Sequence, residues 1–251
     1  MNGLDLFSGI GGMSVALQDW VRPIAYCEID PYCQGVLLSR MYDRGLEEAP
    51  IWDDIKTLSG NFFREKEIDI IYGGFPCQDI SIAGIGKGLA GQRSGLFFEI
   101  IRLLRETRPR FLFLENVPAI TTRGGIEVIK EVAALGYDCR WCVISASSIG
   151  ALHKRDRWFM LAKSNLCDSN IQSSKQANKE TKSYASEKET WGRSSRQSWP
   201  FASINDWKEY LSEMDKCSNG ISFGLDRSRA LGNSVVPQQA REAFKILMGI
   251  N

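Results

Sequence analysis

The sequence is short of histidine and of long apolar runs, and each shortage excludes a class of protein. No stretch approaches the roughly 20 consecutive apolar residues of a membrane-spanning helix. The residues after Met1 form neither a charged nor an apolar leader, so we expect a cytoplasmic protein without membrane contact. His153 is the only histidine, and Cys139 and Cys142 form the only C-x2-C pair. Since a zinc site takes about four ligands, we expect no metal and interpret these two cysteines as packing residues in a strand.

Neither sign of charge dominates, because the sequence has 31 Lys and Arg and 30 Asp and Glu, which gives a net charge of +1. This balance excludes a protein that binds nucleic acid over its whole surface, so such a partner would have to meet a local basic face. The seven cysteines, an odd number, are scattered along the chain. That usage is typical of reduced cytosolic thiols rather than of a disulfide framework.

Short apolar runs alternate with helical patterns from residue 2 to about residue 162 of the 251. Strands are predicted at residues 3–7, 23–27, 68–72, 111–114, 137–144 and 157–162, and helices at 11–20, 31–41, 95–106, 126–135 and 237–248. The alternation predicts a Rossmann-like α/β fold with a mostly parallel, doubly wound sheet covered on both faces. Ligands of such sheets bind at the carboxyl ends of the strands, so functional residues should follow the strands.

The composition changes near residue 163, where Ser, Lys, Glu, Gln and Asn become frequent. We therefore divide the chain into a catalytic and cofactor-binding domain (1–162), a short region (163–222) and a C-terminal segment that returns to the first domain (223–251). The short region is either a flexible insertion or a small substrate-facing module with aromatic contacts from Trp191, Trp199, Trp207 and Tyr210.

The first predicted strand runs into a loop with Gly9, Gly11 and Gly12, where the backbone can turn tightly and approach a ligand. Glu28 follows the second strand, a position that suits a pair of ribose hydroxyls. Asp54 follows a further candidate strand, which lies between the second strand and Asp53, and could cap a helix or hold an adenine amino group. These residues indicate an adenosine-containing ligand without separating a nicotinamide dinucleotide from S-adenosylmethionine.

Three further groups follow the later strands. Cys77 lies in a loop stiffened by Gly and Pro, which makes its thiol a candidate nucleophile. Glu115 ends the next strand, and the cationic cluster of residues 153–157 joins the last two strands of the domain. All three groups should face one edge of the sheet.

These motifs together resemble the DNA cytosine-C5 methyltransferase family. Six blocks match in order, at residues 5–12, 28–30, 73–81, 115–117, 153–157 and 231–236. The most specific are Phe-Pro-Cys-Gln, which contains Cys77, and Glu-Asn-Val, which begins at Glu115. The family usually has Gln where this chain has His153, whose role stays open.

The resemblance implies methyl transfer from S-adenosylmethionine to C5 of a flipped-out cytosine in double-stranded DNA. The implied catalytic residues are Cys77, Glu115, Arg155 and Arg157. The implied cofactor residues are Phe7, Ser8, Gly9, Gly11, Gly12, Glu28, Ile29, Asp54, Ile55, Pro76, Leu96, Asn233, Ser234 and Val235. The implied DNA contacts are Gln78, Ser81, Arg93 and Lys154. The loop of residues 78–94 is expected to be a mobile lid, and we interpret Arg102, Arg105, Arg108 and Arg110 as a solvated face.

The short region 163–222 offers few side chains for reading bases, so we expect a short or relaxed target sequence. We also expect a monomer, encoded by a bacterium or by a virus acting in a bacterial host. Two rival functions keep this fold: a tRNA cytosine-C5 methyltransferase and an inactive DNA-binding homologue. A nicotinamide-dependent oxidoreductase would leave Cys77 and Glu115 unexplained.

Overall fold

A computed structural model describes residues 1–76, 95–165, 230 and 234–250 of the chain. Within these residues, seven strands form one sheet in the order β3-β2-β1-β4-β5-β7-β6. The strands are β1 (Asn2–Leu6), β2 (Arg22–Cys27), β3 (Ile51–Trp52), β4 (Ile70–Gly74), β5 (Phe111–Asn116), β6 (Tyr137–Ser145) and β7 (Asp156–Ser164). The structure confirms the predicted Rossmann-like, mostly parallel sheet.

Only β7 runs against its neighbours, pairing antiparallel with both β5 and β6. The pairs between β1, β2, β3, β4 and β5 are all parallel. The carboxyl ends of these parallel strands therefore share one edge of the sheet with the beginning of β7. That edge is where the predicted functional residues should meet.

The described helices are α1 (Gly12–Leu17), α2 (Pro31–Tyr42), α4 (Leu96–Thr107), α5 (Gly125–Ala133) and α8 (Pro237–Met248), with short 3-10 turns η1 (Gly60–Phe63), η2 (Pro118–Thr121) and η3 (Ala146–Ile149). Each predicted helix is present. The first ends at Leu17 rather than residue 20, and the Trp20 N–H then closes a tighter turn on the Leu17 carbonyl. Asp30 caps α2, because its side chain accepts hydrogen bonds from the Tyr32 and Cys33 N–H groups. Pro31 is the first residue of the helix.

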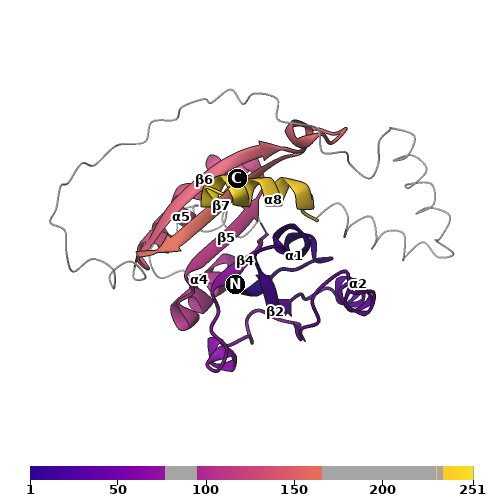
Figure 1. Ribbon diagram of the computed structural model, residues 1–251. Coiled ribbons are helices and arrows are strands. Elements are labelled where there is room, and N and C mark those ends of the chain that lie inside the picture. The colour runs from indigo at the N-terminus through magenta and orange to yellow at the C-terminus, as the bar shows by residue number, and fades with distance from the viewer. Residues whose placement is uncertain (77–94, 166–229, 231–233, 251) are drawn as a thin grey trace.

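Two apolar cores lie on the two faces of the sheet. One core joins α4 and α5 to Leu4, Leu112 and Met160, and the other joins α1 and α8 to Tyr72 and Phe113. Alternate residues of a strand point to opposite faces, so a strand buried on both sides reads as a continuous apolar run. Figure 1 shows α8 and α1 lying next to one another in front of the sheet. The last described helix thus returns to the first.

The C-x2-C pair is split by the sheet. Cys139 packs against the core beneath α4 and α5, whereas Cys142 packs against the core beneath α1 and α8. Residues three apart in a strand point to opposite faces, so the two thiols cannot share one ion. Within the described ranges, no group of His, Cys, Asp or Glu could hold a metal, and no helix is long and apolar enough to cross a membrane.

Arg105, Arg108 and Arg110 are exposed, as the interpretation of a solvated face requires, whereas the side chain of Arg102 is only 31% exposed. Arg102 donates to Glu99, Glu106 and the Ile55 carbonyl, and Arg108 donates to the Leu135 carbonyl. These arginines join neighbouring segments because a guanidinium presents several donors in a fixed plane.

Candidate active site

The carboxyl end of β5 presents an ion pair. The Nε atom of Arg157 lies 2.7 Å from Oε1 of Glu115, and the two side chains are 16% and 11% exposed. Their meeting follows from the register, in which Glu115 pairs with Phe159 and the next residue with Trp158, so the start of β7 adjoins the end of β5. The structure thus brings together two residues that are 42 positions apart in the sequence.

The space for the Glu115 carboxylate exists because β4 ends in glycine. Gly74 pairs with Glu115 in the parallel ladder, and a Cβ atom at Gly74 would lie 2.6 Å from Oε2 of Glu115. Any side chain there would push the carboxylate away from its position beside Arg157.

The electrostatics of Glu115 combine opposing effects. Burial raises its pKa, and the charges of Arg157 and Arg155 offset only part of that rise. The result is a carboxyl whose pKa lies above its ordinary value while it remains within reach of a cation. Such a group can accept and release a proton during a reaction.

Residues from the C-terminal segment fix the neighbouring arginine. The Nη2 atom of Arg155 donates to the Ser234 carbonyl over 2.7 Å. The amide of Gln239, fully buried on α8, donates to the Ile144 and Arg155 carbonyls over 2.6 and 2.7 Å. Sequence reasoning missed Gln239. Its signal is a polar side chain in the stripe formed with Ala240, Ala243, Phe244 and Leu247, all of which are buried.

A cavity of about 180 Å³ lies beside this pair, along the carboxyl ends of β1, β2 and β4. Its lining contains predicted cofactor residues from three separate segments, together with Glu115. The lining residues are Phe7, Ser8, Gly9, Gly12, Met13, Glu28, Asp30, Cys33, Gly74, Glu115, Ala230, Ser234 and Val235. Sequence reasoning missed Met13, Cys33 and Ala230, whose apolar side chains carry no pattern that separates cavity lining from core.

Backbone N–H groups hold the Glu28 carboxylate in place. Oε2 accepts from the Gly9 N–H over 2.7 Å, and Oε1 accepts from the Asp30 N–H over 2.8 Å. A carboxylate can accept about four hydrogen bonds, so each oxygen keeps a site for a ligand hydroxyl. Gly11 precedes α1 in the left-handed region at φ 83°, which explains the glycine at that position.

Six predicted cofactor residues lie outside the cavity lining. Ile29 is 70% exposed, whereas the Ile55 side chain is buried in the core. Asp54 accepts from the Lys56 N–H over 2.9 Å within its own turn. The other three are Gly11, the exposed Pro76 and the half-buried Leu96 at the start of α4.

Several predicted residues fall outside the described ranges: Cys77, Gln78, Ser81, Arg93 and Asn233. The segment that leads to Cys77 is described as far as Pro76. There, the Asn116 amide donates to the Phe75 carbonyl over 2.9 Å. The end of β5 thereby holds the chain at Phe75, two residues before Cys77. Lys154 and His153 are exposed on the connection between η3 and β7.

A buried polar group lies under the glycine loop. Ser14 of α1 donates to Oδ2 of Asp5 over 2.5 Å and also bonds to the Tyr72 hydroxyl over 2.8 Å. Burial raises the pKa of Asp5 to about 7, although Ser14 and Ser8 act in the opposite direction. The other oxygen, Oδ1, is buried and has no hydrogen-bond partner among the described residues.

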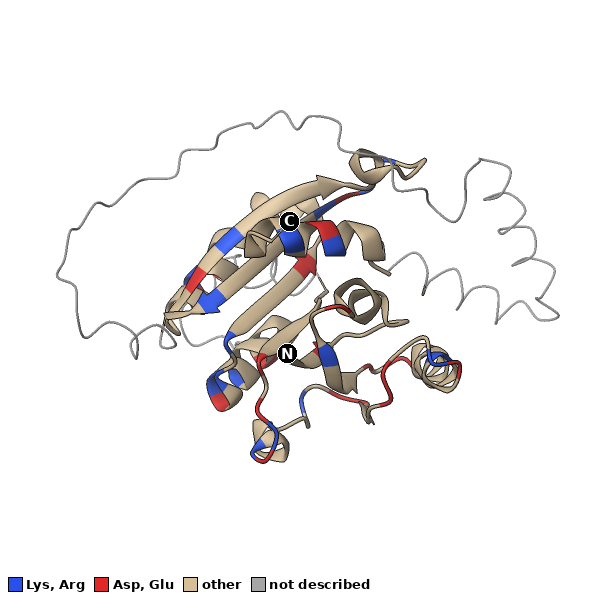
Figure 2. Ribbon diagram, viewed as in Figure 1, with Lys and Arg blue, Asp and Glu red and all other residues tan. Residues whose placement is uncertain are grey.

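Charged residues lie on helices such as α4 and α8, on the surrounding loops and along parts of β6 and β7, and the strands at the centre of the sheet carry few of them (Figure 2). Only eight polar or charged residues are buried in the described ranges, and Asp5, Glu28 and Glu115 are the carboxylates among them. All three belong to strands or strand ends at the same edge. Two of these three carboxyl groups, those of Glu28 and Glu115, line the cavity of the candidate site.

Comparisons with known proteins agree with this architecture. The family model of the C-5 cytosine-specific DNA methylases matches residues 1–219. The type II methyltransferase M.CviJI of Paramecium bursaria Chlorella virus IL3A is 38% identical over 160 residues, 63% of this chain and 42% of that protein. The type II methyltransferase M.HhaI of Haemophilus parahaemolyticus is 36% identical over 177 residues, 67% of this chain and 50% of that protein.

A crystal structure of the S. pombe Dnmt2 methyltransferase superimposes with a TM-score of 0.53 at 23% identity, covering 70% of this chain and 57% of that one. At this identity the likeness concerns the fold. The chain spans about half the length of the relatives named above, with 42% and 50% of their residues covered.

Proposed function

The chain belongs to the C-5 cytosine-specific DNA methylase family, and from that membership we propose that it methylates C5 of a flipped-out cytosine in double-stranded DNA. The observation that carries the proposal is the ion pair beside the cavity, in which Nε of the partly buried Arg157 lies 2.7 Å from Oε1 of the buried Glu115. A carboxyl group with a raised pKa can give a proton to the ring nitrogen of a cytosine. A cation beside it can donate hydrogen bonds to the neighbouring oxygen of the same cytosine.

Cys77 is the proposed nucleophile. Its thiolate forms a bond to C6 of the cytosine. The electron pair of the C5–C6 double bond is then delocalised over C5, C4 and N3. Glu115 protonates or hydrogen-bonds N3 and so lowers the energy of that charge, while Arg157 and Arg155 bind the O2 side and the nearby phosphate. Loss of the C5 proton to a base after methylation restores the double bond and expels the Cys77 thiolate.

The residues around the cavity fit the adenosine and methionine parts of S-adenosylmethionine. Glu28 has free lone pairs for two ribose hydroxyls, and its carboxylate is already oriented by the Gly9 and Asp30 N–H groups. Phe7 supplies an aromatic surface, and Ser234 and Val235 would line the methionine end. When bound, the cofactor supplies the electrophilic methyl group that C5 takes up.

The target base has to leave the helix, which costs a few kcal/mol, before it can enter such a site. Lys154, exposed on the η3–β7 connection, is proposed to contact a phosphate. Gln78, Ser81 and Arg93 are proposed to contact the DNA from the segment that follows Cys77. A short or relaxed target sequence remains our prediction.

Radiolabelled methyl transfer tests the function directly. The full chain is incubated with labelled S-adenosylmethionine and either duplex DNA or tRNA, and methylated cytosines are then mapped at base resolution. We expect label in duplex DNA at a target of two or three bases. Label only in tRNA would contradict the DNA assignment, label in neither would identify an inactive homologue, and a strict target of four or more bases would overturn the predicted relaxed recognition.

A further inference from the structure

The turn of residues 53–60, which follows β3, is bound to α4 by side-chain hydrogen bonds. β3 contains only Ile51 and Trp52, so strand pairing fixes little of the chain that follows it. The Asp54 carbonyl accepts from the Thr57 and Leu58 N–H groups, which closes the turn on itself. These local bonds define the shape of the turn but not its position relative to the sheet.

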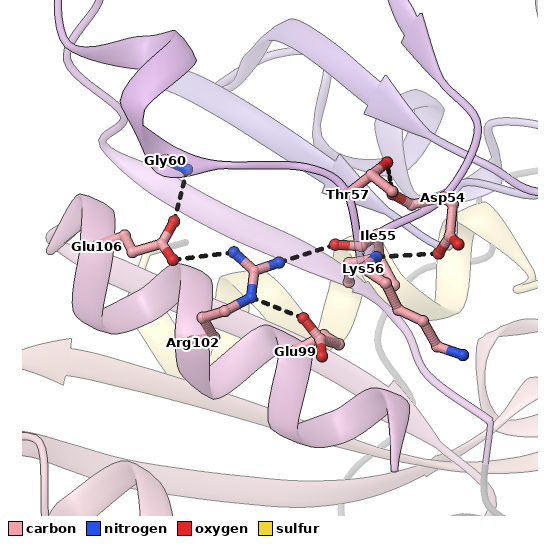
Figure 3. Close-up of polar contacts among 8 residues, drawn as sticks. All are labelled: Asp54, Ile55, Lys56, Thr57, Gly60, Glu99, Arg102 and Glu106. Carbon is pink, nitrogen blue, oxygen red and sulfur yellow. Dashed lines mark hydrogen bonds and ion pairs between the residues drawn. The ribbon is translucent and has the colours of Figure 1, made fainter. Parts of the chain in front are cut away.

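The Ile55 and Leu58 side chains are buried in the core shared with α4, and Arg102 of α4 adds a polar connection to the same turn (Figure 3). Its Nη2 atom donates to the Ile55 carbonyl over 2.8 Å. Its other nitrogens reach Glu99 over 2.7 Å and Glu106 over 2.9 Å, so the two carboxylates fix the plane of the guanidinium. The exposed fractions of the three side chains are 31%, 28% and 33%. Arg102 is therefore braced on its own helix before it reaches the turn.

A second bond from the same group reaches the far end of the turn. Oε2 of Glu106 accepts from the Gly60 N–H over 2.6 Å. Burial raises the pKa of Glu106, but the Gly60 N–H and Arg102 outweigh it and leave that pKa below its ordinary value. The carboxylate thus stays charged at neutral pH. Ile55 and Gly60, on both sides of Thr57, are tied to one helix.

We propose that Arg102 is a positioning residue for the adenosine end of S-adenosylmethionine. It holds the turn that presents Asp54 to the adenine, and its contacts to Glu99 and Glu106 keep that turn at a fixed distance from α4. This inference rests on the proposed function, because Asp54 and Ile55 are assigned to the cofactor only through the resemblance to the same family. It adds a residue that touches neither cofactor nor DNA.

The geometry predicts that the effect is confined to one part of the cofactor. Arg102 reaches the turn after β3, whereas the cavity lining beside Glu115 comes from other segments. Loss of the guanidinium should therefore weaken ligands that contain adenosine and leave the methionine end and the methyl-transfer step unaffected. A general loss of stability would not make this distinction.

The test is isothermal titration calorimetry of the full chain with S-adenosylhomocysteine and with 5′-methylthioadenosine, combined with steady-state kinetics. Arg102→Gln removes the charged guanidinium and its set of hydrogen-bond donors. Arg102→Lys keeps the positive charge but lacks the planar arrangement of donors. Arg105→Gln is the control. Arg105 is exposed on the same helix and has no hydrogen bond or ion pair to another described residue.

We expect Arg102→Gln to weaken both ligands by the same factor, about tenfold, which corresponds to the loss of one charged hydrogen bond. Arg102→Lys should recover part of this affinity, and Arg105→Gln should match the wild type. The KM for S-adenosylmethionine should rise with kcat unchanged at saturation.

Unchanged affinity of Arg102→Gln for 5′-methylthioadenosine would overturn the proposal, with or without a lower melting temperature. The same holds if affinity for S-adenosylhomocysteine falls while that for 5′-methylthioadenosine does not. If the wild-type chain binds neither ligand, the cofactor assignment of the proposed function fails and the role of Arg102 fails with it. Binding without methylation of DNA would leave the role of Arg102 supported and remove only the proposed reaction.

Discussion

The two halves of the sheet's carboxyl edge are built by different means. The cofactor half, at the ends of β1 and β2, orients the Glu28 carboxylate with two backbone N–H groups. The chemical half, at the ends of β4 and β5, orients the Glu115 carboxylate with the side chain of Arg157. Both carboxylates are buried and face the same cavity.

The difference has a physical reason. Backbone N–H groups are neutral and fixed, so they hold Glu28 as a constant hydrogen-bond acceptor, which in the proposed function serves a ribose that stays chemically unchanged. Burial raises the pKa of Glu115 while Arg157 and Arg155 lower it in part, so the balance can shift when a charged or polar base arrives. One half is suited to holding, and the other half is suited to proton transfer.

Glu115→Gln should separate the halves most clearly. An amide keeps the size of the side chain but cannot deliver a proton, so kcat for methyl transfer should fall by about 10²- to 10⁴-fold, the range of general acid–base catalysis. Affinity for S-adenosylhomocysteine should stay within about twofold of the wild type, since the holding half is intact. Glu127→Gln, exposed on α5, is the control. Retention of more than a tenth of kcat would contradict the assigned role.

Asp5→Asn tests a buried carboxyl that, in contrast to Glu115, has no ion pair with a described cation. The pKa of Asp5 is raised to about 7 by burial. A raised folded-state pKa means that its contribution to stability is complete at low pH, below the ordinary value of 3.8, and is lost as the pH rises through about 7.

Urea unfolding at pH 5 and pH 8 checks this prediction. Between these values the wild type should lose about 2 kcal/mol of unfolding free energy relative to Asp5→Asn. The exposed Asp43→Asn should follow the wild type at both values. Parallel pH profiles for the wild type and Asp5→Asn would show that Asp5 does not titrate in this range.

Glu28→Gln is the counterpart of the Glu115 substitution in the holding half. An amide NH₂ group would face one of the backbone N–H donors, so the side chain should turn away from the ribose position. We expect affinity for S-adenosylhomocysteine to fall about tenfold, with kcat at saturating S-adenosylmethionine within about threefold of the wild type. Calorimetry measures the first and initial rates the second. Glu47→Gln, at an exposed ion pair with Arg22, provides the comparison. A loss of kcat as large as that of Glu115→Gln would remove the distinction between the halves.

The two halves of the sheet's carboxyl edge also differ in how much of their structure the sequence predicts. The holding half forms within the first 30 residues, and its strand–loop–helix order predicts that Gly9 and Glu28 meet. The pattern of strands also predicts that Glu115 and the arginine cluster share an edge. It does not predict the Gln239 amide, because that contact joins α8 to carbonyls of residues 95 and 84 positions away.

Arg102 illustrates a second limit. Its spacing from Glu99 and Glu106 is that of an ordinary exposed helix pair, which contributes little to stability in isolation. The contact that gives it a role is a backbone carbonyl 47 residues away, and side-chain patterns carry no information about which carbonyl faces a helix. Likewise, the closeness of Gly74 to Glu115 follows from strand register, which only the fold provides.

Trapping on duplex DNA that contains 5-fluorocytosine tests the central claim most directly. The fluorine at C5 cannot leave as a proton does, so the enzyme stays attached to C6 after methyl transfer. Mass spectrometry of the digested adduct should place the bond on the peptide that contains Cys77, and Cys77→Ser should give no adduct while still binding S-adenosylhomocysteine. An adduct on another residue, or full methylation by Cys77→Ser, would contradict the claim that the thiol at 77 works beside Glu115 and Arg157.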